Sequence, residues 1–303
     1  MYTQIKKENF KETIKKELMS RIKGAKLYEN NVVKNNVTKL GIVVNRANEN
    51  ISPTFYIDDL YNMYLENNSI DEVVDFIENV VNENRPQTTI IDKLNNVYEN
   101  VLPRLVNKQT NYQLLSDCPH RDFLDMAIVY YIEEKDINNN GIVSIKVTND
   151  ILQLGNLSEE KLYKHAMENL KKKEQHKILG MSSQMIELMT NKKINENIDD
   201  IDFYNEIFVV LSNFVGVNGC RQILNNDLLK TIADKIKNDF YVLPSSIHEV
   251  LITPTDLVGT NENDIETLKK MVTDINEEKV GIEEQLTDNV YIYRYDKQCL
   301  EVA

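Results

Sequence analysis

Apolar positions at the start of the chain predict a helix followed by a hairpin. The first stripe repeats at every fourth position and comprises Phe10, Ile14, Leu18 and Ile22. That spacing places the four side chains on one face of a helix. Residues 26–33 and 38–44 then predict two strands, because Asn35-Asn36 between them tolerates the left-handed backbone angles of a tight turn.

Beyond this hairpin, short apolar runs and helical patterns alternate irregularly. A run at 101–107 predicts an edge strand, because Pro103 cannot donate a backbone hydrogen bond. Further strands are expected at 51–57, 123–132, 142–147, 207–211, 240–243, 248–252 and 290–295. Helices are expected after Asp58, after Ser69, after Ser158 and over 264–277, where polar residues can cap their first turns.

Many neighbouring strands in this pattern are separated by turns rather than by helices. The pattern therefore favours an α+β fold with mixed or antiparallel sheets, hairpin-connected strands and packed helices, over a doubly wound parallel sheet. With 303 residues, the chain is long enough for two lobes. We expect a division into 1–108 and 109–303, or a single family domain.

Charge restricts the partners. The chain carries a formal net charge of -13, so its surface repels phosphate backbones and non-specific nucleic-acid binding is not expected. The first helix is an exception, because several lysines and one arginine, Arg21, surround its apolar stripe. That helix either docks on the core with a solvated basic face or contacts an anionic partner or a membrane surface.

Neither a membrane span nor a secretion signal is expected, because no apolar run is long enough for either. The three cysteines, Cys118, Cys220 and Cys299, are odd in number and widely spaced. A disulfide framework is therefore not expected, and a cytoplasmic location fits best.

The segment 136–144 resembles the start of a calcium-binding loop. Asp136, Asn138 and Asn140 supply oxygen atoms at alternate positions, and Gly141 stands at the sixth position. The twelfth position should be a bidentate Glu, and here it is Val147. A β-hairpin turn explains the same residues without an ion, and no metal is expected.

Two further segments carry candidate catalytic groups. Cys118 and His120, followed by Asp122 and Asp125, offer a thiol, an imidazole and carboxylates that suit zinc or a Cys–His nucleophile pair. The alternative is a turn before a buried strand, in which the acids bind backbone groups or Arg121.

The second segment is Pro244-Ser245-Ser246-Ile247-His248-Glu249. Ser246, His248 and Glu249 are candidate hydrolase residues, although the chain contains no G-x-S-x-G or H-E-x-x-H motif. A polar strand edge after a turn is the alternative. Gly216 and Gly219 predict a tight connection, and without a phosphate-binding lysine or a full G-x-G-x-x-G no cofactor is expected.

A further set of segments is informative when taken together: Ile51–Tyr56, Pro119–Val129, Leu211-Ser212-Asn213, Gly219 and Leu243–Glu249. In these segments the chain resembles an uncharacterised bacterial family, found mainly in anaerobic low-GC Gram-positive organisms. The resemblance spans most of the chain. It implies no reaction, because none is established for that family.

The sequence leaves three functions open. We expect a cytoplasmic, non-enzymatic binding or regulatory protein that engages a protein partner. One alternative is a hydrolase or metal-dependent enzyme, its site assembled from Cys118, His120, His248 and Glu249. Another is a mobile-element protein that engages a host partner. The enzyme interpretation requires that the two histidine-bearing segments meet in the fold.

Overall fold

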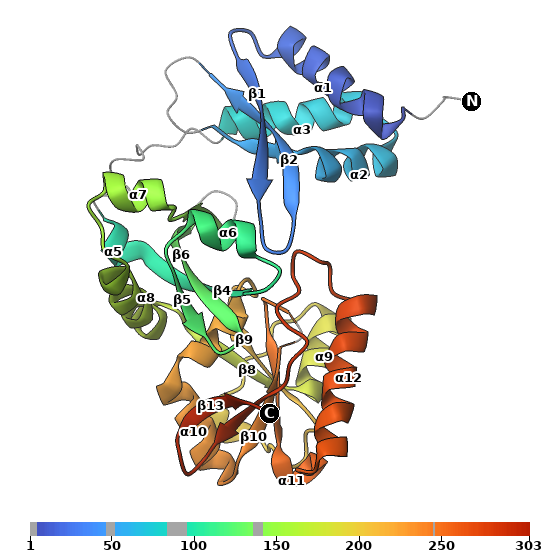
Figure 1. Cartoon of the computed structure of the whole chain (residues 1–303). Coiled ribbons are helices and arrows are strands. Elements are labelled where there is room, and N and C mark those ends of the chain that lie inside the picture. The colour runs from blue at the N-terminus through green and yellow to red at the C-terminus, as the bar shows by residue number, and fades with distance from the viewer. Residues whose placement is uncertain (1–4, 47–51, 84–95, 136–141, 245) are drawn as a thin grey trace. The chain divides into compact units, whose positions relative to one another are not determined.

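The computed structural model of the chain describes residues 5–46, 52–83, 96–135, 142–244 and 246–303. It forms two compact units, Met1–Asn96 and Val97–Ala303. Every strand pair between described residues is antiparallel. Helices accompany the sheets in both units (Figure 1), which confirms the α+β class.

The described residues of the first unit form a three-stranded sheet in the order β1-β2-β3 together with the helices α1, α2 and α3. Its elements are α1 (Lys7–Arg21), β1 (Lys26–Val33), β2 (Thr38–Asn45), β3 (Thr54–Tyr56), α2 (Ile57–Asn67) and α3 (Ile70–Glu83). The predicted hairpin is confirmed, with Asn36 between its strands at a φ of 61°.

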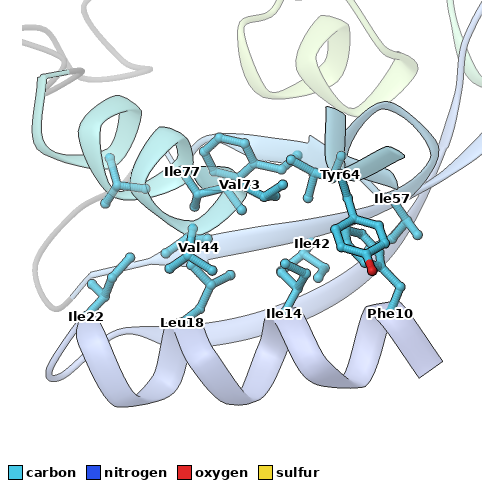
Figure 2. Packing of buried hydrophobic residues seen from close by; sticks show 14 residues of the cluster. Phe10, Ile14, Leu18, Ile22, Ile42, Val44, Ile57, Tyr64, Val73 and Ile77 are labelled. Atoms are coloured by element: carbon cyan, nitrogen blue, oxygen red, sulfur yellow. The ribbon is translucent and has the colours of Figure 1, made fainter. Parts of the chain in front are cut away.

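The core of this unit is built on the predicted stripe of α1. Phe10, Ile14 and Leu18 are at most 1% exposed, and they pack against Ile42 and Val44 of β2 (Figure 2). Apolar side chains of α2 and α3 complete the same cluster. An amphipathic helix docked on a sheet is therefore the correct interpretation of the four-residue repeat.

Several basic residues of α1 are neutralised within the same unit. The ammonium groups of Lys11 and Lys15 lie 2.9 and 2.7 Å from the two carboxylate oxygens of Glu29 on β1. Arg21 pairs with Asp71 and Asp75 of α3. These contacts favour the interpretation in which α1 docks on its own core.

In the second unit, the strands that the structure describes form two sheets. Its strands are β4 (Val101–Asn107), β5 (His120–Phe123), β6 (Met126–Lys135), β7 (Ile142–Lys146), β8 (His176–Gly180), β9 (Val209–Asn213), β10 (Phe240–Leu243), β11 (Val250–Pro254), β12 (Tyr291–Arg294) and β13 (Cys299–Val302). Its helices are α5 (Val97–Asn100), α6 (Tyr112–Asp117), α7 (Asn149–Leu154), α8 (Glu159–Lys173), α9 (Met181–Thr190), η1 (Ile198–Asp200), η2 (Gly219–Leu224), α10 (Asn226–Ile236), α11 (Thr255–Val258) and α12 (Glu262–Glu278). The predicted division at residue 108 would fall after β4.

In the smaller sheet, β6 pairs with β4, β5 and β7. Strand β4 pairs with β6, and Pro103 lies in it as expected for an edge strand. A two-residue turn, Leu124-Asp125, joins β5 to β6, and Leu124 has a φ of 57°. This turn matters below because of what Asp125 contacts.

The larger sheet has the order β13-β12-β10-β11-β9-β8. Helices α12 and α10 flank it on opposite sides (Figure 1). Val210, Tyr241 and Leu251 from three of its strands share a core cluster with Leu268 and Val272 of α12. Met181 of α9 packs against the same cluster. Helix α9 therefore lies on the same face of the sheet as this core.

Some local expectations need correction. Strand β11 begins at Val250 rather than at residue 248, so His248 and Glu249 precede it. The tight connection expected at Gly216 and Gly219 leads into the 3-10 segment η2, and no side chain larger than hydrogen fits at Gly219. A Cβ atom there would lie 2.5 Å from the His248 carbonyl oxygen and 2.7 Å from the Asn213 nitrogen. None of the helices in the described ranges is both long and apolar enough to cross a membrane.

Candidate functional site

The Cys118–His120 segment does not present a reactive thiol. Cys118 follows α6, is 2% exposed, and donates a 3.0 Å hydrogen bond from Sγ to the carbonyl oxygen of Leu114. Burial raises its pKa to about 11, so the group is a thiol at neutral pH and a poor nucleophile or metal ligand. His120 lies exposed on β5, with Nδ1 3.0 Å from the Cys118 carbonyl oxygen.

Asp122 and Asp125 have different environments. Asp122 is exposed and pairs with Lys108 at 2.5 Å. Asp125 accepts hydrogen bonds from Thr287 Oγ1 at 2.9 Å, Asn289 Nδ2 at 2.8 Å and the Tyr291 hydroxyl at 2.5 Å. Asp125 therefore ties the β5–β6 turn to the chain entering β12. This contact is structural, and no reactant is needed to explain the residue.

The hydroxyl of Ser246 and the ring of His248 do not form a nucleophile–base pair. Ser246 Oγ accepts a 3.0 Å hydrogen bond from the backbone nitrogen of His248. The ring nitrogen Nδ1 of His248 accepts from the Asn218 backbone nitrogen at 3.2 Å. A neutral ring must then carry its proton on Nε2, which lies 3.4 Å from Glu284 Oε1.

Glu249 differs from the other candidates. It is half-buried, and burial raises the pKa of its carboxyl group. None of the residues that the structure describes donates a hydrogen bond to it. A buried carboxyl without a partner is costly, and perturbed acids of this kind concentrate at functional sites.

The structure gives the two histidine-bearing segments separate contacts. His120 interacts with Cys118, and His248 with Asn218 and Glu284. Within the described ranges, no group of three or more His, Cys, Asp or Glu side chains could hold a metal ion. The calcium-loop candidates Asp136, Asn138 and Asn140 lie outside the described residues.

A buried charge network, which the sequence analysis missed, lies in the second unit. Arg221 of η2 is 1% exposed and contacts Glu133 of β6 and Glu174 after α8, whose side chains are 4% and 9% exposed. Its Nε donates to Glu174, Nη1 to Glu133 and the Pro103 carbonyl oxygen, and Nη2 to both carboxylates. Arg104 also pairs with Glu133, at 2.7 Å.

This network is electrically balanced. Burial alone would raise the pKa of Glu133, but the charges and hydrogen bonds of Arg221 and Arg104 outweigh burial and hold that pKa below its ordinary value. Two cations and two carboxylates sum to zero, and all five N–H groups of Arg221 have acceptors. The network forms part of the lining of a cavity of about 500 Å³, yet its guanidinium has no donor left for a ligand.

One feature of the sequence around Arg221 could have indicated the buried charge network. Arg221 stands among Cys220, Ile223 and Leu224, which are all buried. A charged residue inside such an apolar run calls for a buried partner. The sequence could not identify the partners of Arg221, because Glu133 and Glu174 lie 88 and 47 residues away from it along the chain.

Helix α9 carries an exposed apolar face. Met185, Ile186, Leu188 and Met189 are 54%, 52%, 72% and 83% exposed. The first turn of the helix is fixed by two carboxylates: Glu196 accepts from the Gly180 backbone nitrogen at 3.0 Å, and Glu206 from that of Ser182 at 3.1 Å. Contiguous apolar side chains on an anchored helix are typical of a protein-binding surface, and methionine suits such surfaces because it is adaptable.

Comparisons with known proteins bear on the family. No curated protein and no solved structure matches the chain. The model of a family of unknown function, DUF5688, matches residues 7–295. That match covers nearly the whole chain, and the protein therefore belongs to this family.

Proposed function

We propose that this chain is a non-enzymatic cytoplasmic binding protein that engages a protein partner through the outer face of α9. The observation that carries the proposal is the exposure of Met185, Ile186, Leu188 and Met189 on one short helix. Further support comes from the candidate catalytic groups. The Cys118 thiol is buried, and His248, Ser246 and Asp125 hold backbone or side-chain contacts within the fold.

Charge favours a partner other than a second copy of the chain. Two copies would each carry a formal net charge of -13, and like charges suppress association. A partner with an apolar groove and a basic rim satisfies both the methionine-rich helix and the acidic surface.

The test compares three full-length proteins as baits in a lysate of the organism that encodes the chain. The baits are the wild type, the double variant Met185→Glu/Met189→Glu, and the control Met19→Glu, whose methionine is also exposed. We expect the wild type and the control to retain one protein in near-stoichiometric amount, and the α9 variant to lose it.

Two outcomes would contradict the proposal. One is identical recovery by all three baits, or recovery by none, across a series of salt concentrations. The other is a wild-type homodimer in sedimentation velocity that the α9 substitutions dissociate, which would assign the face to self-association.

A further inference from the structure

A second, smaller cavity lies on the larger sheet, beneath the inner side of α9. Lys177 of β8 and Ser212 of β9 are paired in the register, and Leu179 and Val210 form the next row. Glu249 directly precedes Val250, the partner of Leu211, so it continues the row of Lys177 and Ser212 on the same face. These five side chains belong to the lining of a cavity of about 270 Å³.

The walls of this cavity are held in place by the fold. Gln184 and Glu187 of α9 form one side, and the turn at Phe214-Val215-Gly216 forms another. The side chain of Asn213 fixes that turn, since its Oδ1 accepts from the Gly216 nitrogen at 2.7 Å and its Nδ2 donates to the Val217 carbonyl oxygen at 2.9 Å. This wall of the cavity is therefore held by hydrogen bonds within the fold.

Two of its four charges form an ion pair with each other. The other two, Lys193 and Glu249, make no ion pair or hydrogen bond with a described residue, although Lys193 acts electrostatically on Glu187 and Lys177 on Glu249. Lys177 donates to both carboxylate oxygens of Glu187, at 2.6 and 2.7 Å. Glu249 receives no hydrogen bond from the part of the chain that the structure describes. Lys193 is exposed at the mouth, and no carboxylate of a described residue lies within ion-pair distance of it.

We propose that this cavity binds a small amino-carboxylate zwitterion, such as a free α-amino acid, with its ammonium group on Glu249 and its carboxylate on Lys193. The four charged side chains sum to zero, so a zwitterion satisfies both unpaired groups without adding net charge. A simple amine would meet Lys177 and Lys193, and a simple carboxylate would meet Glu187 and Glu249.

Size and lining agree with that class of ligand. The volume lies below the range of about 300–1,000 Å³ that accommodates drug-sized molecules. Leu179, Val210 and Val215 add apolar surface for a short aliphatic side chain. Binding of the ammonium group would also give the half-buried carboxylate of Glu249 a hydrogen-bond donor with a positive charge.

The experiment titrates the full chain with the proteinogenic amino acids, using thermal shift at about 10 mM ligand and calorimetry for those that stabilise the protein. L-valine is compared with its two halves, isobutylamine and isovalerate. At least one amino acid should bind, and the amine or the carboxylate alone should bind about tenfold more weakly or worse.

Variants locate the site. Glu249→Gln keeps the shape and removes the charge, and should weaken binding of the amino acid by about tenfold or more. Lys193→Ala, at the exposed mouth, should weaken binding as well and tests the site independently of Glu249. Lys192→Ala, at an exposed neighbour outside the cavity, should leave the affinity unchanged.

The inference is overturned if no amino acid stabilises the protein, if an amino acid that binds does so no more tightly than its decarboxylated amine, or if both variants keep the wild-type affinity. It goes beyond the proposed partner binding and fails separately from it. Met185→Glu/Met189→Glu changes the outer face of α9 and should leave amino-acid binding intact, while Glu249→Gln should leave partner capture intact.

Discussion

Arg221 pairs with two buried carboxylates through one guanidinium. The side chains of Glu133 and Glu174 are 4% and 9% exposed. Removing one partner of such a network leaves uncompensated charge in the interior, which costs far more than the net value of the network itself.

Arg221→Met is therefore expected to lower the free energy of unfolding by about 3–5 kcal/mol, measured by urea denaturation of the full chain. Lys230→Met, at an exposed position on α10, is the matched control and should stay within about 0.5 kcal/mol. Wild-type stability of the Arg221 variant would show that Glu133 and Glu174 are not buried as described.

Glu249→Gln should stabilise the protein in a pH-dependent way. Burial raises the pKa of this carboxyl above its unfolded value, and the nearby His248 and Lys177 only partly oppose that shift. Folding therefore disfavours the ionised form, so the wild type loses stability as pH rises from the unfolded pKa through the folded pKa. Lys193 and Glu187 face the same cavity and are unchanged by the substitution.

At pH 8 the melting temperature of Glu249→Gln should exceed that of the wild type, by about 2–4 °C for each 1 kcal/mol of stability gained. At pH 4 the two melting temperatures should be nearly equal. Differential scanning calorimetry at the two pH values measures this. Glu277→Gln, at an exposed position of α12, should show no comparable difference between them. An equal effect of Glu249→Gln at both pH values would contradict the burial of an unpaired acid.

Among the elements, the β5–β6 hairpin offers a matched pair of acids. Asp125→Ala removes the acceptor of three hydrogen bonds from the segment that enters β12 and should cost about 3 kcal/mol of unfolding free energy. Asp122→Ala removes an exposed ion pair with Lys108 and should cost less than about 1 kcal/mol. Equal losses for the two variants, measured by urea denaturation, would refute the anchoring role of Asp125.

Elements with a local signature were predictable from sequence. The stripe of α1, the β1–β2 hairpin and the Ser158 cap of α8 all follow from neighbouring residues. Strand β8 and helix α9 were not predicted. The apolar residues of α9 face outward, so they do not form the core-facing stripe from which a helix is predicted. Long-range partners, such as Thr287 and Tyr291 for Asp125, leave no trace in a local pattern.

For the molecule as a whole, fold class followed from the spacing of strands and turns, and the acidic surface from residue counts. The candidate site did not follow as fully. Glu249 was singled out beside His248, but its cavity is completed by Lys177 and by residues of α9. The pairing and register of β8, β9 and β11 bring these residues to Glu249. A single sequence does not specify that register.

Because the second unit has its own core, residues 97–303 should fold when expressed alone. We expect a single cooperative thermal transition, and Asp125→Ala should lower the stability of this fragment as much as that of the full chain. A fragment without a cooperative transition in calorimetry would show that the first unit is required for folding of the second.

The contact between Asp125 and Tyr291 joins positions 166 residues apart, and this separation sets an order of events during synthesis. The first unit ends before residue 97 and can fold while the second unit is still being synthesised, because domains that are synthesised first generally fold first. The second unit cannot close its larger sheet until β12 has emerged beside β10. We therefore expect the second unit to finish folding only after β12 and β13 have been synthesised. Until then the nascent chain would expose unpaired strand edges of the larger sheet to chaperones.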